Sequence, residues 1–131
     1  MKREQRHMPC QFKVDRIRAS YTRIHKALAW MLDNERNLQA RGIGLLHSDT
    51  GKYVHGVVIQ DKRIRSTPDE LHEVTITKGK KVVMSEQASS VVQALAKMLE
   101  RSIRDECQAL ADAWGMETEA NLEQHKDESG N

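Results

Sequence analysis

Hydrophobic residues recur at helical spacing near the start of the chain. They step by three or four residues, as one face of an α-helix does, and continue past a polar position at Glu35. The stripe consists of Val14, Ile17, Tyr21, Ile24, Leu28, Met31 and Leu38. Gly42 follows, and glycine is common just past a helix C-terminus because it adopts positive φ at little steric cost. The pattern predicts a long helix from about Phe12 to Gly42.

A second stripe with the same spacing occupies the later part of the chain. Its members are Ala88, Val92, Leu95, Leu99, Ile103, Cys107, Leu110 and Trp114. Ser85 is suited to cap this helix, because a serine hydroxyl accepts a hydrogen bond from a free backbone N–H. Glu86 would lie near the positive end of the helix dipole. Gly115 follows the stripe, so we expect a second long helix that ends there.

Between the stripes, the pattern is typical of short β-strands. Two runs, Ile43–His47 and Lys52–Gln60, are separated by Ser48–Gly51, whose aspartate and glycine favour a hairpin turn. Gly56 lies inside the second run, which suggests a bulge or close packing. The sequence therefore predicts a hairpin with its turn at Ser48–Gly51.

A second hairpin is predicted after a polar connection from Asp61 to Glu70. Its strands are Leu71–Thr77 and Lys81–Met84, joined by a turn at Lys78–Lys80. The expected order is helix, hairpin, hairpin, helix. This order indicates an α+β fold with a long N-terminal helix, a small antiparallel sheet of two hairpins (about four strands) and a long C-terminal helix.

The length and composition indicate one folded domain. A chain of 131 residues with 38% hydrophobic and 31% charged residues has room for one core. We expect a flexible basic arm at residues 1–10, a single α+β domain at 11–115 and an acidic disordered tail at 116–131. The N-terminus lacks a hydrophobic signal region and no apolar run is long enough to span a bilayer. A cytoplasmic protein with no membrane partner is therefore expected.

The helices also suggest self-association. Each would be about 45 Å long at 1.5 Å per residue, whereas a domain of about 105 residues is about 35 Å across. The segment Ala27–Leu32 is apolar on every side, so either the sheet and the second helix both pack on it, or a second subunit does. We therefore expect a homodimer. Its interface, or that with another protein partner, would include Tyr21, Ile24, Leu28, Trp30 and Met31.

Charge is distributed unevenly along the chain. Residues 1–26 contain eight Lys and Arg against two acidic residues, whereas residues 100–131 contain nine acidic residues against three Lys and Arg. Further basic residues cluster in the central connection and the second turn. Phosphate backbones are bound by cations arranged on a helix and loops. The candidate nucleic-acid-binding residues are Lys13, Arg16, Arg18, Arg23, Lys26, Lys62, Arg63, Arg65, Lys78, Lys80 and Lys81.

Two functions are consistent with these features. The first is a small homodimeric nucleic-acid-binding or regulatory protein, whose ligand could be either DNA or RNA. The second is a non-enzymatic adaptor or inhibitor that binds a protein partner through its apolar helix faces. The cations could also form an ordinary solvated surface that discourages aggregation. Tyr53 is the one aromatic residue near them that is suited to base stacking.

Catalytic, metal and cofactor sites are not expected. Asp49-Thr50-Gly51 matches the aspartic-protease tripeptide but fits a hairpin turn better. Strand pairing could bring His47, His55 and His72 together, yet metal-binding spacing is missing and we expect half-exposed strand residues. Cys10 and Cys107 do not form a CxxC pair. Because nucleophile and phosphate-loop motifs are also missing, we do not expect an enzyme.

Overall fold

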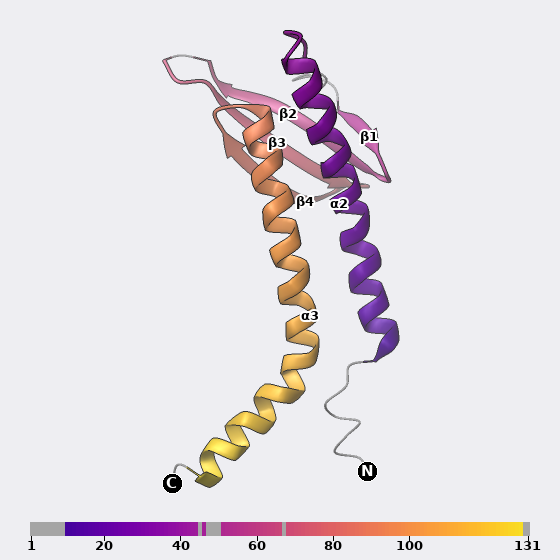
Figure 1. The fold of residues 1–131 in the computed structure, drawn as a ribbon, viewed down its shortest axis with the longest axis vertical. Coiled ribbons are helices and arrows are strands. Elements are labelled where there is room, and N and C mark those ends of the chain that lie inside the picture. The colour runs from indigo at the N-terminus through magenta and orange to yellow at the C-terminus, as the bar shows by residue number, and fades with distance from the viewer. Residues whose placement is uncertain (1–9, 45, 47–50, 67, 130–131) are drawn as a thin grey trace. The chain divides into compact units, whose positions relative to one another are not determined.

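The computed structural model describes residues 10–44, 46, 51–66 and 68–129, with side chains as far as Gly115. It confirms the α+β architecture: two helices and, between them in the chain, a four-stranded antiparallel sheet with strand order β1-β2-β3-β4 (Figure 1). The elements are α2 (Gln11–Gln39), β1 (Lys52–Val54), β2 (Val57–Arg65), β3 (Leu71–Lys78), β4 (Lys81–Ala88) and α3 (Val91–Ser129).

The chain forms two compact units. The larger, Thr22–Ile103, contains the sheet and the adjoining parts of both helices. The smaller contains the remaining parts of both helices, within Met1–Tyr21 and Arg104–Asn131. In the smaller unit, Val14 of α2 and Ala113 of α3 are buried and Tyr21 is half-buried.

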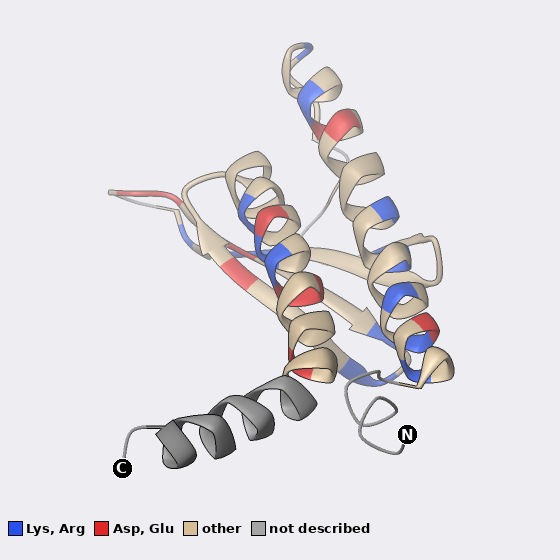
Figure 2. Cartoon of the chain, turned by 60° about the horizontal axis from the view of Figure 1, so that its bottom comes forward, with Lys and Arg blue, Asp and Glu red and all other residues tan. Residues whose placement is uncertain are grey.

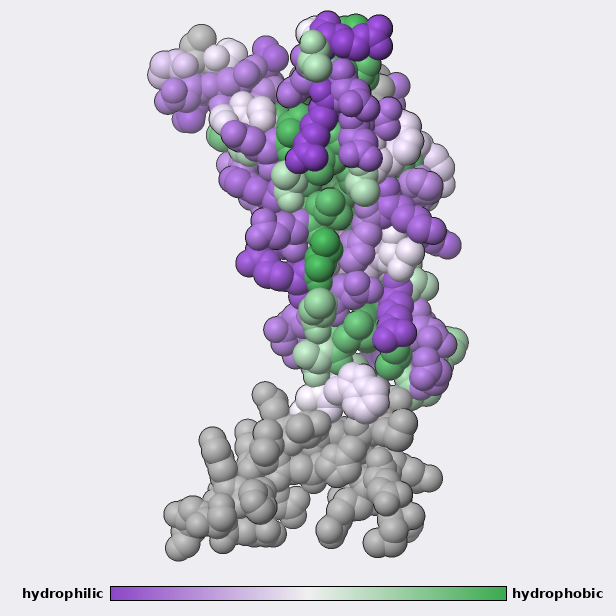
Figure 3. Space-filling view, viewed as in Figure 1, coloured by the Kyte–Doolittle hydropathy of each residue, from purple (hydrophilic) through white to green (hydrophobic). Residues whose placement is uncertain are grey.

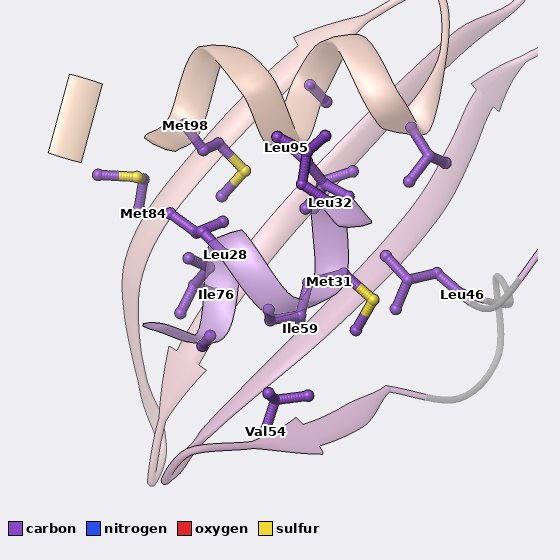
Figure 4. Packing of buried hydrophobic residues seen from close by; sticks show 14 of the residues in the cluster. Leu28, Met31, Leu32, Leu46, Val54, Ile59, Ile76, Met84, Leu95 and Met98 are labelled. Carbon is purple, nitrogen blue, oxygen red and sulfur yellow. The ribbon is translucent and has the colours of Figure 1, made fainter. Parts of the chain in front are cut away.

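The core of the larger unit lies between the sheet and the two helices, which cover the same face of the sheet (Figure 1). Inward and outward residues alternate along β2 and β3, so one side of each strand enters the core. The fully buried side chains include Leu28 and Met31 from α2, Ile59 and Ile76 from the sheet, and Leu95 and Met98 from α3 (Figure 4). The core is thus aliphatic, with methionine filling the space between branched side chains.

The first hairpin differs from the prediction. Its turn is His55–Gly56, with φ of 46° and 86°, and it splits the expected strand Lys52–Gln60 into β1 and the start of β2. Positive φ at both central residues is the mark of a type I′ turn, whose twist matches that of antiparallel strands. The expected strand Ile43–His47 is not a strand at residues 43, 44 and 46. His47 and most of the expected turn lie outside the described residues.

The second hairpin is confirmed, but its strands β3 and β4 and the preceding strand β2 extend further than predicted. β3 and β4 are joined at Gly79, where φ is 63°. β2 continues to Arg65, so the first half of the expected connection Asp61–Glu70 is strand. Pairing with β3 along this length accounts for the extension, because it satisfies the backbone groups of polar residues as well as apolar ones.

The helix ends were predicted with mixed success. Gly42 ends α2 as expected: with φ of 75° it allows Ile43 N–H to bond Leu38 O at 2.8 Å and Gly42 N–H to bond Gln39 O at 2.9 Å. This pattern is a Schellman motif. Gly115 does not end α3, which continues to Ser129. A single glycine in a helix costs only about 1 kcal/mol relative to alanine, so the helix tolerates it.

The N-terminal cap of α3 is Ser90, not Ser85. The Ser90 hydroxyl accepts the N–H of Gln93 at 3.1 Å, and its carbonyl accepts the N–H of Ala94 at 3.0 Å. Ser85 lies within β4, opposite Thr75, and Ala88 also belongs to this strand. The pairing with β3 continues four residues beyond the expected strand end at Met84, and the helix begins only after it stops.

Candidate nucleic-acid interface

The order of the strands brings two turns to the same end of the sheet. In this meander, the β1–β2 turn and the β3–β4 turn lie at one end, and the β2–β3 connection lies at the other. The two turns are neighbours, because Val58 is opposite Thr77, and Thr77 is opposite Val82. The lysines of the second turn therefore lie beside His55 and Gly56, although about 25 residues separate them in the sequence.

Helix α2 adds two cations at this end. Arg23 lies over the first turn: its Cδ and Nη1 atoms are each 3.8 Å from the position that a Cβ would occupy on Gly56. Lys26 follows one helical turn later on the same flank. Together with Thr22, Tyr53, His55 and Gly56, these two residues line a pocket of about 440 Å³.

The charge at this end is of one sign. We call it the basic end and define it by Arg23, Lys26, Lys78, Lys80 and Lys81, all of which are exposed. Figure 2 marks the Lys and Arg positions of the chain in blue and the Asp and Glu positions in red. The segments that build it, residues 22–32, 51–60 and 74–85, contain no Asp or Glu. Among the described residues, none of the five cations takes part in an ion pair. Such an uncompensated group attracts anions more strongly than cations that already have carboxylate partners.

Three other predicted cations lie at the opposite end of the sheet. Lys62, Arg63 and Arg65 belong to β2 and not to a connection, as the sequence had suggested. Arg63 forms an ion pair with Glu70 at 3.0 Å, and Arg65 Nε donates a hydrogen bond to the Asp69 carbonyl at 3.0 Å. Lys62 is opposite Glu73 in the sheet. Glu70 therefore compensates the charge of Arg63, and these three cations are not part of the basic end.

The remaining predicted cations belong to the smaller unit. Lys13, Arg16 and Arg18 are exposed on the first half of α2. The Arg16 guanidinium lies 5.7 Å from the centroid of the Phe12 ring, within cation–π range. A separate pocket of about 530 Å³ is lined by Phe12, Lys13, Arg16, Ile17, Ser20 and Tyr21.

Most of the predicted interface residues are buried in the core of the chain itself. Ile24, Leu28 and Met31 are buried in the core of the larger unit, where Leu28 lies between the sheet and α3 (Figure 4). Of the two explanations for the apolar segment Ala27–Leu32, packing by both the sheet and α3 therefore accounts for its buried residues. Trp30 is 43% exposed and Tyr21 is half-buried, so these two retain surface for a partner.

His55 and His72, the two described histidines of the predicted strands, are not brought together. His55 is in the first turn, whereas His72 pairs with Arg63 at the other end of the sheet, and His47 lies outside the described residues. His72 is buried, with Nδ1 3.0 Å from both carboxylate oxygens of Asp61 and Nε2 3.3 Å from Glu70 Oε1. Within the described part of the chain, no group of three or more His, Cys, Asp or Glu side chains could hold a metal ion.

The contacts of His72 indicate a structural role. Both ring nitrogens face carboxylates, so the imidazole connects β2, β3 and the residue before β3. A pocket of about 290 Å³ adjoins it, and Ser90 also lines this pocket. The Ser90 hydroxyl, however, is engaged as the cap of α3. These groups therefore do not form a nucleophile–base pair.

Four of the six residues that line the pocket at the basic end, Thr22, Tyr53, His55 and Gly56, were not among the predicted site residues. His55 and Gly56 were assigned to the middle of a strand, and Tyr53 was noted for stacking but not placed in the site. The His-Gly pair in the sequence was the available signal for a turn, although it is weaker than the Asn-Gly pair usual in such turns.

Comparison with protein-family models, curated proteins and solved structures finds no match to this chain. Over the described residues, neither helix has an apolar stretch sufficient to cross a membrane.

Proposed function

We propose that this protein binds nucleic acid through the basic end, and that it acts as a small regulatory or nucleic-acid-binding protein. One observation carries the proposal: Arg23 and Lys26 of α2 lie at the β1–β2 turn, the lysines of the β3–β4 turn lie at the same end of the sheet, and the segments that contain them have no acidic residue. Lys and Arg contacts to phosphate supply most of the affinity of nonspecific nucleic-acid binding.

The alternative of an ordinary solvated surface accounts less well for this arrangement. Exposed cations on folded proteins are commonly interspersed with acidic residues, as they are around Arg63 and Glu70 at the opposite end of the sheet. At the basic end, five like charges from two distant segments lie at two adjacent turns of the sheet. Their mutual repulsion costs stability unless an anionic ligand offsets it.

The test is a comparison of two double charge reversals, one within α2 and one at the C-terminal end of α2 and the turn after it. Arg23→Glu with Lys26→Glu changes the basic end, whereas Arg36→Glu with Arg41→Glu makes the same change in net charge at the exposed C-terminal end of α2. Binding of random-sequence DNA and RNA, single-stranded and duplex, would be measured by fluorescence anisotropy over a range of salt concentrations.

We expect the first variant to weaken binding at least tenfold and to reduce the slope of log K against log salt by about 1.4 to 1.8, the value for two lost phosphate contacts. The second variant should bind nearly as the wild type does. The proposal is wrong if the wild type binds neither DNA nor RNA at low salt, or if both variants lose affinity equally.

A second function, binding of a protein partner, is favoured by one feature of α3. Val92, Ala96, Leu99 and Ile103 recur at steps of four, three and four residues and form an apolar line along α3. Figure 3 shows an apolar strip along this side of the molecule. Ile103 is 48% exposed, and the other three are only partly buried. An apolar line of this kind is suited to a second helix, including that of another copy of the chain.

A further inference from the structure

We infer that the pocket at the β1–β2 turn binds a phosphomonoester, namely the phosphate group at the end of a nucleic-acid strand. This inference rests on the proposed function and names the part of the ligand that the pocket receives. The pocket has a volume of about 440 Å³, within the usual range for small-ligand sites. It therefore has room for a phosphate group together with part of the nucleotide that carries it.

Two elements supply the polar groups of this pocket. Helix α2 contributes Thr22, Arg23 and Lys26, and the turn of the first hairpin contributes His55. A guanidinium and an ammonium group are charged donors at neutral pH, and a hydroxyl and an imidazole N–H are further donors. The residues that line the pocket include no Asp or Glu. Its chemistry therefore favours an anion with several acceptor oxygens.

The donors of the pocket are available to a ligand. Within the described part of the chain, no hydrogen bond or ion pair engages the exposed side chains of Thr22, Arg23, Lys26 and His55. The pocket beside His72, by contrast, has three carboxylates in its lining. An anion is therefore expected at the first turn and not beside His72, because carboxylates repel it.

Folding places one of the cations against the turn. The Cδ and Nη1 atoms of Arg23 are each 3.8 Å from the position that a Cβ would occupy on Gly56. Gly56 has φ of 86° and belongs to the type I′ turn, so the backbone beside the guanidinium has a defined conformation. A donor that is already in place loses less conformational entropy when the ligand binds.

The residue at the first position of the turn also suggests a ligand. His55 has φ of 46°, and Asn-Gly or Asp-Gly is the pair that a type I′ turn prefers. Residues in sparsely populated backbone conformations occur often at ligand sites. This position carries an imidazole where the turn alone favours asparagine or aspartate, as expected if the imidazole contacts a ligand.

A terminal phosphate suits the pocket better than a phosphate within a strand. It carries a charge of about −1.5 to −2 at neutral pH and three acceptor oxygens, whereas an internal phosphate carries a single negative charge. Arg23 and Lys26 together supply two positive charges. A strand end can also enter a pocket directly, whereas an internal phosphate has a nucleotide on each side.

The neighbouring turn is placed to bind the rest of the strand. Lys78, Lys80 and Lys81 lie at the β3–β4 turn, at the same end of the sheet. Two strand spacings, about 10 Å, separate the two turns. Cations at this distance can contact the phosphates that follow the first one, and their contribution does not depend on the chemistry of the strand end.

The test compares oligonucleotides of about twelve nucleotides that differ only in a 5′-phosphate, a 3′-phosphate or free hydroxyl ends. DNA and RNA with an internal fluorescent label would be used, and anisotropy at low salt would give the affinities. We expect the wild type to bind one of the phosphorylated oligomers about tenfold more tightly than the unphosphorylated one, equivalent to about 1.4 kcal/mol. Equal affinities for all three would overturn the inference.

Two substitutions test whether the end phosphate binds in this pocket. Thr22→Val removes the hydroxyl with little change in shape and should reduce the preference for the phosphorylated end about threefold. His55→Asp introduces a carboxylate but keeps a pair favoured in type I′ turns, and it should abolish the preference. Asn37→Asp is the matched control for charge, since Asn37 is exposed near the C-terminal end of α2. It should keep the full preference.

Circular dichroism would verify that all three variants fold. A preference that both pocket variants retain in full would place the end phosphate elsewhere and overturn the inference.

Competition distinguishes a strand end from a free phosphate compound. Inorganic phosphate and a nucleoside monophosphate would each be added to the labelled complex. We expect displacement only at concentrations at least a hundredfold above the Kd of the oligomer, because these small compounds do not reach the lysines of the second turn. Displacement at concentrations near that Kd would assign the pocket to a free phosphomonoester and overturn the assignment to a strand.

The failures of the two proposals are distinguishable. If the Arg23→Glu, Lys26→Glu variant loses affinity for every nucleic acid but the wild type binds all strand ends equally, the basic end binds phosphates and the pocket inference is wrong. If the wild type binds no nucleic acid at low salt, with or without an end phosphate, both proposals fail.

Discussion

At the scale of single residues, three buried ionisable side chains, Glu35, Asp61 and His72, have polar partners. Asp61 and His72 contact each other, and the carboxylate of Glu35, which is 2% exposed, accepts the N–H of Leu46 at 2.6 Å. Glu35 occupies a polar position within the apolar stripe of α2. This hydrogen bond connects the segment after α2 to the helix. It also gives the buried carboxylate a partner, without which the carboxylate would be strongly destabilising.

Tyr21 gives a prediction for pH dependence. Its pKa is raised above 10.0, first by burial and then by the nearby carboxylates of Asp105 and Glu106. Because the folded state holds the phenol proton more tightly than the unfolded chain does, the resulting stability is complete below pH 10.0 and is lost as the pH rises through the raised pKa.

Tyr53→Phe leaves Tyr21 as the sole tyrosine, so phenolate absorbance would report it alone. We expect the titration midpoint to lie above pH 10.0 in the folded protein and to return to about 10 in denaturant. A midpoint at or below 10 in the folded protein would contradict the burial of this phenol.

At the scale of elements, the β1–β2 hairpin depends on one unusual residue. His55 has φ of 46°, a left-handed conformation that most side chains avoid, and Gly56 at 86° follows it. Asparagine adopts this conformation several times more readily than most residues, and Asn-Gly is the preferred pair in type I′ turns.

We therefore expect His55→Asn to raise the free energy of unfolding by about 0.5 kcal/mol and Gly56→Ala to lower it by about 1–2 kcal/mol. A Cβ at Gly56 meets only the Arg23 side chain at 3.8 Å, so the loss would come from backbone strain and not from a clash. Urea denaturation would measure both changes. Gly115→Ala is the matched control, because that glycine lies in a helix with open space around it and should gain stability.

Strand β4 shows how α3 also protects an edge of the sheet. Arg101 donates a hydrogen bond to the Ser85 carbonyl at 3.1 Å, and Lys97 donates one to the Gln87 carbonyl at 3.4 Å. β4 is an edge strand, and free edge groups invite pairing with other chains. These two cations therefore serve the fold, in contrast to Arg23 and Lys26 at the basic end.

At the scale of the whole molecule, the open question is assembly. Homodimerisation, expected from the sequence, stays a prediction, and the line Val92, Ala96, Leu99 and Ile103 on α3 is now the better candidate for the contact. Ile103→Glu should abolish association, because a charge at the centre of an apolar contact must be desolvated without a partner. Val82→Glu on β4 is the control, since Val82 is 59% exposed and lies on another element.

Light scattering over a range of concentrations would measure the mass of the wild type and both variants. A wild type that is monomeric at every concentration would contradict the dimer. A dimer that survives Ile103→Glu but not Val82→Glu would place the contact on the sheet and not on α3.

The sequence by itself determined the features that depend on neighbours in the chain. Apolar spacing predicted both helices, Gly42 predicted the end of α2, and Lys78–Lys80 predicted the turn between β3 and β4. Each depends on local periodicity or on the conformational freedom of glycine. The prediction that Gly115 ends the second helix was wrong. A glycine inside a helix costs only about 1 kcal/mol relative to alanine, and the rest of the helix outweighs this cost.

Only the tertiary structure decided which distant residues meet. Strand pairing placed the first turn at His55–Gly56, moved the cap of α3 to Ser90 and buried Asp61 beside His72. It also divided the predicted cations: Arg23 and Lys26 lie at the β1–β2 turn, at the same end of the sheet as Lys78, Lys80 and Lys81, whereas Arg63 is paired with Glu70. Charge is a property of each residue, but whether charges act together depends on strand order and register, which follow from the packing of the whole sheet.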